Sequence, residues 1–267
     1  MSRKVALIGT GVMGQAVLAS VIEHTGAEQV QVHDVRSDVG RQVAADHEVG
    51  WARSVADAGR EAAAVIVAVK PHDVPAVLEE LRQTLPASAV VVSVAAGVST
   101  ATMAEHLPEG AITIRVMPNT PALIGQGVSV LSPGPHAGKE HLELVEQLLA
   151  GTGYVTTVEE QYQDVVTAIS GSGPAYVFYL VDALAEAGVL GGLSREVALE
   201  LARRTVAGSG AMAADSEEHP AVLRERVSSP GGTTMAAITE LDDRAVRAAV
   251  VAAARRAWER AAELGGG

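Results

Sequence analysis

A glycine-rich turn near the start of the chain restricts the possible folds more than any other segment. The apolar run 5–8 is typical of a buried parallel strand, and Gly9-Thr10-Gly11-Val12-Met13-Gly14 follows it directly, ahead of a stretch with helical character. In this spacing the first glycine permits a tight turn, the second lets the backbone approach a pyrophosphate, and the third lets helix and strand pack closely. Amide groups at the helix N-terminus would then face the phosphates. Strand, turn and helix in this order favour a dinucleotide-binding domain over an ordinary strand-to-helix turn.

The pattern of apolar residues divides the chain at residue 160. Before it, apolar runs predict strands at 5–8, 29–33, 62–69, 89–94, 112–116, 128–131 and 154–158, with helices between them at 15–23, 37–46, 74–85, 99–107 and 136–149. This alternation is typical of a doubly wound parallel sheet. After it, alanine-rich helical segments follow at 161–170, 174–187, 194–214, 220–227 and 244–264. We therefore expect a Rossmann-type α/β dinucleotide-binding domain at 1–160 and an all-α domain at 161–267.

Composition excludes several classes of function. The net charge is −12, which argues against nucleic acid or an anionic membrane as a partner. The chain has no cysteine, and its eight histidines are scattered, so we expect no metal site. No apolar run approaches membrane length and no signal peptide is recognisable, which predicts a cytoplasmic protein with a small-molecule substrate. Several helices after residue 160 are apolar on more than one face, and a second subunit is the expected cover.

The predicted strand ends suggest one ligand crevice. Ligands of open parallel sheets bind outside the carboxyl ends of the strands. Irregular segments fall at five such ends, namely 9–14, 33–37, 69–73, 95–97 and 117–121. Any one of them could simply terminate a strand, but five at one edge favour a nucleotide site.

Two neighbouring residues predict different dinucleotides. Asp34 ends the second predicted strand, where an acid accepts hydrogen bonds from the ribose 2′-hydroxyl of NAD. Arg36 and Ser37 follow, and they could hold the 2′-phosphate of NADP through charge-assisted bonds. The sequence alone leaves this choice open.

The helical domain indicates the reaction by what it lacks. It contains no lysine, and its one histidine, His219, sits in an acidic stretch before a proline. Enzymes that reduce ketones need a proton donor, whereas a protonated imine accepts hydride readily, so a C=N substrate fits better. The turn 228–234 could receive a carboxylate on its backbone amides and offer a threonine hydroxyl to the imine nitrogen, although a simple helix N-cap explains it as well. The glycines of 169–176 suit a packing hinge at least as well as a ligand site.

These motifs resemble those of pyrroline-5-carboxylate reductases, and the resemblance covers nearly the whole chain. The segments that carry it are 9–14, 68–71, 95–97, 115–121, 170–176 and 228–234. The last two, Ser-Gly-Ser-Gly-Pro-Ala-Tyr and Ser-Ser-Pro-Gly-Gly-Thr-Thr, are specific in this order and separation.

The resemblance implies reduction of 1-pyrroline-5-carboxylate to L-proline, the last step of proline biosynthesis, with NADPH as the usual donor and NADH possible. It implies a homodimer or a higher homo-oligomer such as a decamer. Thr234 would bond the ring nitrogen as the catalytic residue, Gly232 and Thr233 would receive the carboxylate, and Glu160 and Glu217 would line the substrate side. The predicted cofactor-binding residues are Gly9, Thr10, Gly11, Val12, Met13, Gly14, Asp34, Arg36, Ser37, Ala68, Val69, Lys70, Pro71, Ala96, Gly97 and Asn119.

Two alternatives remain beside this interpretation. The first is a related imine or β-hydroxyacid reductase with the same two domains, although the missing lysine argues against the hydroxyacid branch. The second is a dinucleotide-binding protein without turnover, and the intact loop from Gly231 to Thr234 argues against it. Oxidation of NADPH on addition of pyrroline-5-carboxylate would distinguish them.

Overall fold

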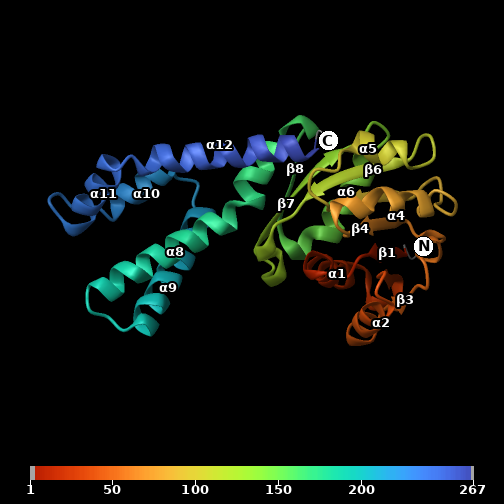
Figure 1. The fold of residues 1–267 in the computed structure, drawn as a ribbon, viewed down its shortest axis with the longest axis horizontal. Coiled ribbons are helices and arrows are strands. Elements are labelled where there is room, and N and C mark those ends of the chain that lie inside the picture. The colour runs from red at the N-terminus through yellow and green to blue at the C-terminus, as the bar shows by residue number, and fades with distance from the viewer. Residues whose placement is uncertain (1–3, 266–267) are drawn as a thin grey trace. The chain divides into compact units, whose positions relative to one another are not determined.

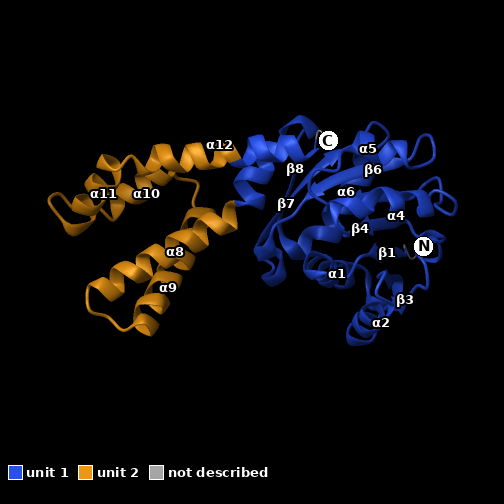
Figure 2. Cartoon of the chain, viewed as in Figure 1, with its two compact units in different colours: residues 1–172, 257–267 blue, residues 173–256 orange. Residues whose placement is uncertain are grey.

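The computed structural model describes residues 4–265 and divides by its internal contacts into two compact units. One unit comprises residues 1–172 and 257–267, and the other comprises residues 173–256 (Figure 2). Residues 161–172 and the end of the chain therefore pack with the first unit, although they follow the change in sequence pattern. A division into functional domains after residue 160 stays a prediction.

The first unit is built on one sheet of eight strands (Figure 1). The strands are β1 (Val5–Ile8), β2 (Val30–His33), β3 (Gly50–Trp51), β4 (Ala64–Val67), β5 (Val90–Ser93), β6 (Ile112–Met117), β7 (Gly127–Pro133) and β8 (Gly153–Thr157). Their order across the sheet is β3-β2-β1-β4-β5-β6-β7-β8. The chain starts in the middle and winds outward in both directions, which confirms the predicted Rossmann-type class.

One strand pair departs from the parallel arrangement. β7 runs antiparallel to β6, while the other neighbouring pairs of the sheet are parallel. A parallel neighbour needs a crossover of about a dozen residues or more. Only residues 118–126 join these two strands. They include a short 3₁₀ helix, Thr120–Ile124, which follows Pro118 and contains Pro121 near its start. The connection is too short for a crossover, so the chain turns back beside the strand that it has just left.

Helices cover both faces of the sheet. They are α1 (Val12–Thr25), α2 (Ser37–Asp46), α3 (Val55–Gly59), α4 (Val74–Leu81), α5 (Thr100–Glu105), α6 (Lys139–Leu149) and the short α7 (Gln163–Val166). Along β1, Val5 and Leu7 join a core with α1, α2 and α6, whereas Ala6 and Ile8 join a second core with α3, α4 and α5. Successive strand residues point to opposite faces, so a strand buried on both sides must be apolar throughout. This explains the uninterrupted apolar runs of the sequence.

The second unit is entirely helical in the residues described. It contains α8 (Gly173–Leu190), α9 (Arg195–Asp215), α10 (Pro220–Arg226), α11 (Thr233–Asp243) and the first part of α12 (Val246–Gly265). α8 packs on α9 through small residues, since a Cβ at Gly188 would lie 2.8 Å from that of Ala198. Many large apolar side chains remain exposed, among them Phe178 and Tyr179 on α8 at 65% and 80%. These faces are not covered within the chain.

A single helical run in the described residues has the length and composition of a membrane span. It extends over Glu160–Leu190, and an 18-residue stretch within it has a mean hydropathy of 1.2 and is hardly buried. The sequence predicted two separate helical segments here, 161–170 and 174–187. A π-helix, Thr167–Gly171, instead continues α7 into α8 across glycines that otherwise indicate a break. One such helix is weak support for a membrane protein. An apolar face of this kind equally marks a surface between subunits.

Candidate active site

The glycine turn lies where three strands end side by side. The Gly9 amide donates to the His33 carbonyl at 2.8 Å, and the Ala68 amide donates to the Ile8 carbonyl at 2.7 Å. Gly9 has a φ of +95°, and a Cβ there would lie 2.7 Å from the Ala68 carbonyl oxygen. A Cβ at Gly14 would overlap the Gly9 carbonyl. Neither position can hold a side chain without moving the backbone.

The start of α1 suits the pyrophosphate of a dinucleotide. Gly11 is the N-cap residue, and no side chain caps this end of the helix. A Cβ at Gly11 would meet no atom within 4 Å, so its backbone borders open space. Uncapped amides at the first turn of a helix favour an anion. The residues present therefore fit the cofactor that the sequence predicted.

Asp34 points back toward the glycine turn. Its Oδ2 accepts hydrogen bonds from the Thr10 amide at 2.9 Å and the Thr10 hydroxyl at 2.8 Å. Its Oδ1 accepts one from the Arg36 amide at 3.0 Å and lies 3.5 Å from the Arg36 Nε. Asp34 and Thr10 are both buried. Burial by itself would raise the pKa of Asp34, but the hydrogen bonds from Thr10 and Arg36 and the Arg36 charge outweigh it and hold that pKa below its ordinary value.

Arg36 and Ser37 are exposed at the start of α2. Arg36 is the N-cap residue, and no side chain caps this helix either. The guanidinium is 64% exposed beside the buried carboxylate of Asp34. A positive side chain at an uncapped helix start provides two interactions that favour a phosphate.

Other predicted cofactor residues lie at neighbouring strand ends. Ala68 to Pro71 follow β4, and Ala96 and Gly97 follow β5, which is next in the sheet. Gly97 has a φ of +76° and lies beside Gly265 at the end of α12. The structure thus brings the segments after β1, β2, β4 and β5 to one edge, as the sequence analysis expected.

Asn119 uses its side chain within the protein. Its Nδ2 donates to the Ser170 carbonyl at 3.0 Å, and its Oδ1 accepts from the Val128 amide at 2.8 Å. It therefore links the turn after β6 to the π-helix. Close by, a Cβ at Gly171 would lie 2.6 Å from the Met117 Cε, which fits the packing role considered for this segment.

Glu160 binds the start of α5. Its carboxylate accepts hydrogen bonds from both the amide and the hydroxyl of Thr100, and its Oε1 lies 3.6 Å from Nη1 of Arg115. Asp164 lies 3.7 Å from Nη2 of the same arginine, which is buried. Glu160 is thus one of two partly buried carboxylates that flank the buried Arg115 in the first unit.

The remaining predicted substrate residues lie in the second unit. Gly232 is the N-cap residue of α11, its amide donates to the Ser229 carbonyl at 3.0 Å, and a Cβ there would overlap the Ser229 hydroxyl. The Gly232 amide is thus engaged within the turn, contrary to the expectation that it is exposed. Thr233 and Thr234 open the first turn of α11, which no side chain caps. Glu217 is exposed in the connection between α9 and α10.

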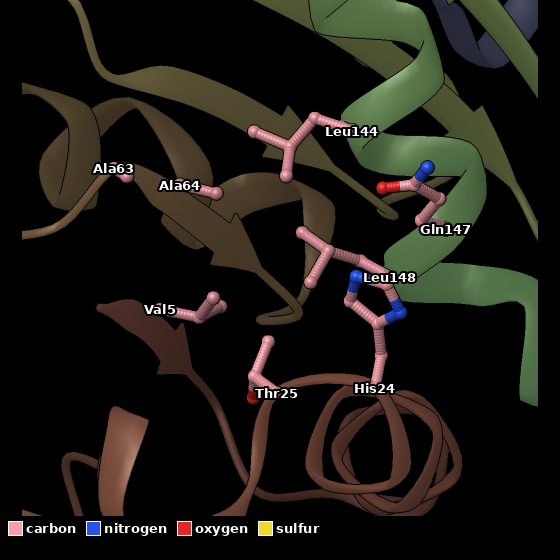
Figure 3. A pocket seen from close by; sticks show the side chains of 8 residues that line it. All are labelled: Val5, His24, Thr25, Ala63, Ala64, Leu144, Gln147 and Leu148. Carbon is pink, nitrogen blue, oxygen red and sulfur yellow. The ribbon is translucent and has the colours of Figure 1, made fainter. Parts of the chain in front are cut away.

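A cavity of about 330 Å³ lies elsewhere in the first unit (Figure 3). Its lining includes Val5 and Ala64, the first residues of β1 and β4, together with Leu144 and Leu148 of α6 and His24 near the end of α1. It therefore borders the amino ends of these strands, opposite the glycine turn. It is not part of the candidate site.

Sequence reasoning missed two contacts of this region. It treated Thr10 only as part of the glycine turn, not as the partner of Asp34. It also assigned no structural role to Arg115, although a lone charge within the apolar strand β6 signals a buried ion pair, since arginine is almost never buried without a partner.

The fold and the site together define a class. The first unit has an uncapped α1 N-terminus directly after a glycine turn, and the helical unit that follows has exposed apolar faces. This combination is typical of two-domain, dinucleotide-dependent oxidoreductases. Residues 4–97 match the family model described as "NADP oxidoreductase coenzyme F420-dependent", and residues 160–264 match "Pyrroline-5-carboxylate reductase dimerisation".

Similar proteins extend over the full length. A pyrroline-5-carboxylate reductase of Methanosarcina acetivorans is 36% identical, with 99% of this chain and 98% of that protein covered. The structure of such a reductase from Coxiella burnetii has a TM-score of 0.93 at 31% identity, with 99% of each chain covered. One from Plasmodium falciparum with NADP bound has a TM-score of 0.86 at 26% identity, with 98% of each covered. The chain belongs to the pyrroline-5-carboxylate reductase family. Its activity is the NAD(P)H-dependent conversion of 1-pyrroline-5-carboxylate to proline.

Proposed function

We propose that the chain makes L-proline with NADPH as its preferred donor, and that Thr234 is its catalytic residue. The observation that carries the cofactor preference is the exposed Arg36 at the uncapped start of α2, beside an Asp34 whose carboxylate is engaged by the protein. Bound NADPH supplies the hydride that C4 of its nicotinamide transfers to the carbon of the C=N bond.

The chain's part in the reaction is to hold and orient the two ligands. Residues 9–14 would receive the pyrophosphate, Arg36 and Ser37 the 2′-phosphate, and the segments 68–71 and 96–97, with Asn119, the nicotinamide half. Fixing two reactants in one geometry supplies much of the rate in reactions of this kind.

The substrate half of the site is proposed at the start of α11. The backbone at Gly232 and Thr233 would receive the substrate carboxylate. Because the Gly232 amide donates to Ser229, the donors would be the uncapped amides of the first turn of α11, which begins at Thr233. The Thr234 hydroxyl would bond the ring nitrogen and orient the imine. Glu217 would lie on the substrate side, and Glu160 would contribute by fixing the start of α5, since its carboxylate already binds Thr100.

The family's dimerisation region makes the protein a homo-oligomer. We propose a homodimer as the basic unit, further assembly up to a decamer, functional domains at 1–160 and 161–267, and a cytoplasmic location. The uncovered apolar side chains of α8 and α9 support the dimer, because a second copy would bury them.

Oxidation of NADPH by the purified protein on addition of 1-pyrroline-5-carboxylate tests the function, with proline identified as the product. A β-hydroxyacid and a larger cyclic imine serve as alternative substrates. Turnover of either in place of pyrroline-5-carboxylate would favour a related reductase. Tight NADPH binding with no turnover of any of the three would favour a binding protein.

A further inference from the structure

The contact between Thr10 and Asp34 joins two residues that are 24 positions apart in the chain and both buried. It consists of two hydrogen bonds to one carboxylate oxygen, from the Thr10 amide at 2.9 Å and the Thr10 hydroxyl at 2.8 Å. Any residue except proline could provide the amide, but the second bond needs a hydroxyl side chain in the middle of the first Gly-x-Gly. A position that the glycine motif leaves unspecified thus carries a contact to the end of β2.

The other carboxylate oxygen of Asp34 is also engaged. The Arg36 amide donates to it at 3.0 Å, and the Arg36 Nε lies 3.5 Å away. A carboxylate offers about four lone-pair positions. Asp34 therefore meets four donors of its own chain, and a ribose hydroxyl could bond to it only by displacing one of them.

We propose that Asp34 is a positioning residue that braces the glycine turn through the Thr10 hydroxyl. Because its carboxylate is engaged in this contact, Asp34 does not bind the ribose 2′-hydroxyl. Selection between the dinucleotides then falls to Arg36 and Ser37. The proposal rests on the proposed NADPH-dependent function and explains how an acid after β2, typical of NAD enzymes, coexists with NADP binding.

Calorimetric titration of the full-length protein with NADP⁺ and with NAD⁺ tests the brace without turnover. Thr10→Val keeps the branched shape and removes the hydroxyl. The affinities for both dinucleotides should fall by a similar factor, on the order of tenfold for a lost bond to a charged group. Their ratio should stay near that of the wild type, because Thr10 acts on the pyrophosphate turn that both ligands share.

Two further variants at Thr10 separate loss of the hydroxyl from loss of packing. Thr10→Ser retains the hydroxyl and should restore both affinities to near wild type, which loss of packing alone would not predict. Thr10→Ala replaces the valine variant if the latter does not fold. In kinetics, the KM for each cofactor should rise while kcat at saturating cofactor changes little.

Two results would contradict the proposal that Asp34 braces the glycine turn. One is wild-type affinity of Thr10→Val for both dinucleotides, because the hydroxyl would then position nothing. The other is a selective loss of NAD⁺ affinity in Asp34→Asn, because the acid would then contact the ribose directly. Failure of the proposed function is separate, since binding of NADP⁺ and NAD⁺ is measured whether or not pyrroline-5-carboxylate is reduced.

Discussion

Glu160 and Thr100 lie 60 residues apart, and both donors of the threonine bind the one carboxylate. The amide of Thr100 donates to Oε1 at 2.8 Å and its hydroxyl donates to Oε2, so the glutamate holds the first turn of α5. The same carboxylate lies 3.6 Å from the buried Arg115. The segment after β8 is thereby fixed to the start of α5 and to Arg115 of β6.

Replacement of Glu160 by glutamine should destabilise the first unit. The amide keeps one acceptor for Thr100 but removes the charge beside Arg115, which retains only Asp164 at 3.7 Å. Loss of a charged hydrogen bond next to a buried cation costs about 1.5–3 kcal/mol. Urea unfolding should show a midpoint lowered accordingly. Glu159→Gln, at an exposed neighbouring position, is the control and should unfold like the wild type. Equal midpoints for all three proteins would mean that the Glu160 contacts contribute nothing.

Thr234→Ala should lower kcat by about a hundredfold, the usual cost of removing one donor that acts on the reacting group. Steady-state assays with saturating NADPH measure this directly. Thr239→Ala is a matched control, because Thr239 lies on the same helix and its hydroxyl donates to the Met235 carbonyl at 3.0 Å. A folded Thr234→Ala variant with normal turnover would remove this residue from the mechanism.

Arg36→Ala should weaken NADPH binding about tenfold or more and leave NADH binding nearly unchanged. Of the two cofactors, only NADPH carries the 2′-phosphate to which the guanidinium can form charge-assisted bonds. Fluorescence titration with each reduced cofactor compares the two. Arg60→Ala, another exposed arginine with an acidic neighbour, should alter neither affinity. An equal loss for both cofactors would place Arg36 outside the 2′-phosphate site.

The lowered pKa of Asp34 predicts how its stabilising effect depends on pH. Because the folded-state value lies below the unfolded value of 3.8, the ionised acid stabilises the fold above that pH and loses the effect as pH falls through the folded value. The difference in free energy of unfolding between wild type and Asp34→Asn should be constant near neutral pH and shrink below about pH 4. Urea titrations at fixed protein concentration across this range measure it. A difference that stays constant or widens in acid contradicts the lowered pKa.

Phe178→Glu should disrupt the oligomer. Phe178 is 65% exposed on α8 in the single chain, and a charge buried there between subunits would lack a partner. The dissociation constant of the dimer should rise about a hundredfold or more, as measured by sedimentation velocity over a dilution series. Lys139→Glu, on the exposed start of α6, is the control. An unchanged sedimentation profile for Phe178→Glu would place the interface elsewhere.

The sequence by itself determined the order of most elements and the place of the glycine turn. Period and glycine spacing are local properties, so β1, the glycine turn and the position of α2 could be predicted from short windows. The two-residue strand β3 and the short α3 were missed, because neither is long enough to show a period.

Tertiary structure decided what the polar side chains do. Sequence placed Asp34 and Arg36 at the end of β2 and left the choice between the dinucleotides open. Only the folded chain brings Thr10 against that acid and Thr100 against Glu160, because the sheet order sets β1 beside β2 and the return of the chain after β8 meets α5. A carboxylate accepts hydrogen bonds equally well from a ribose hydroxyl and from a backbone amide. Asp34 binds Thr10, which lies 24 residues away in the sequence, and Glu160 binds Thr100, which lies 60 residues away. These partners come close only in the folded chain.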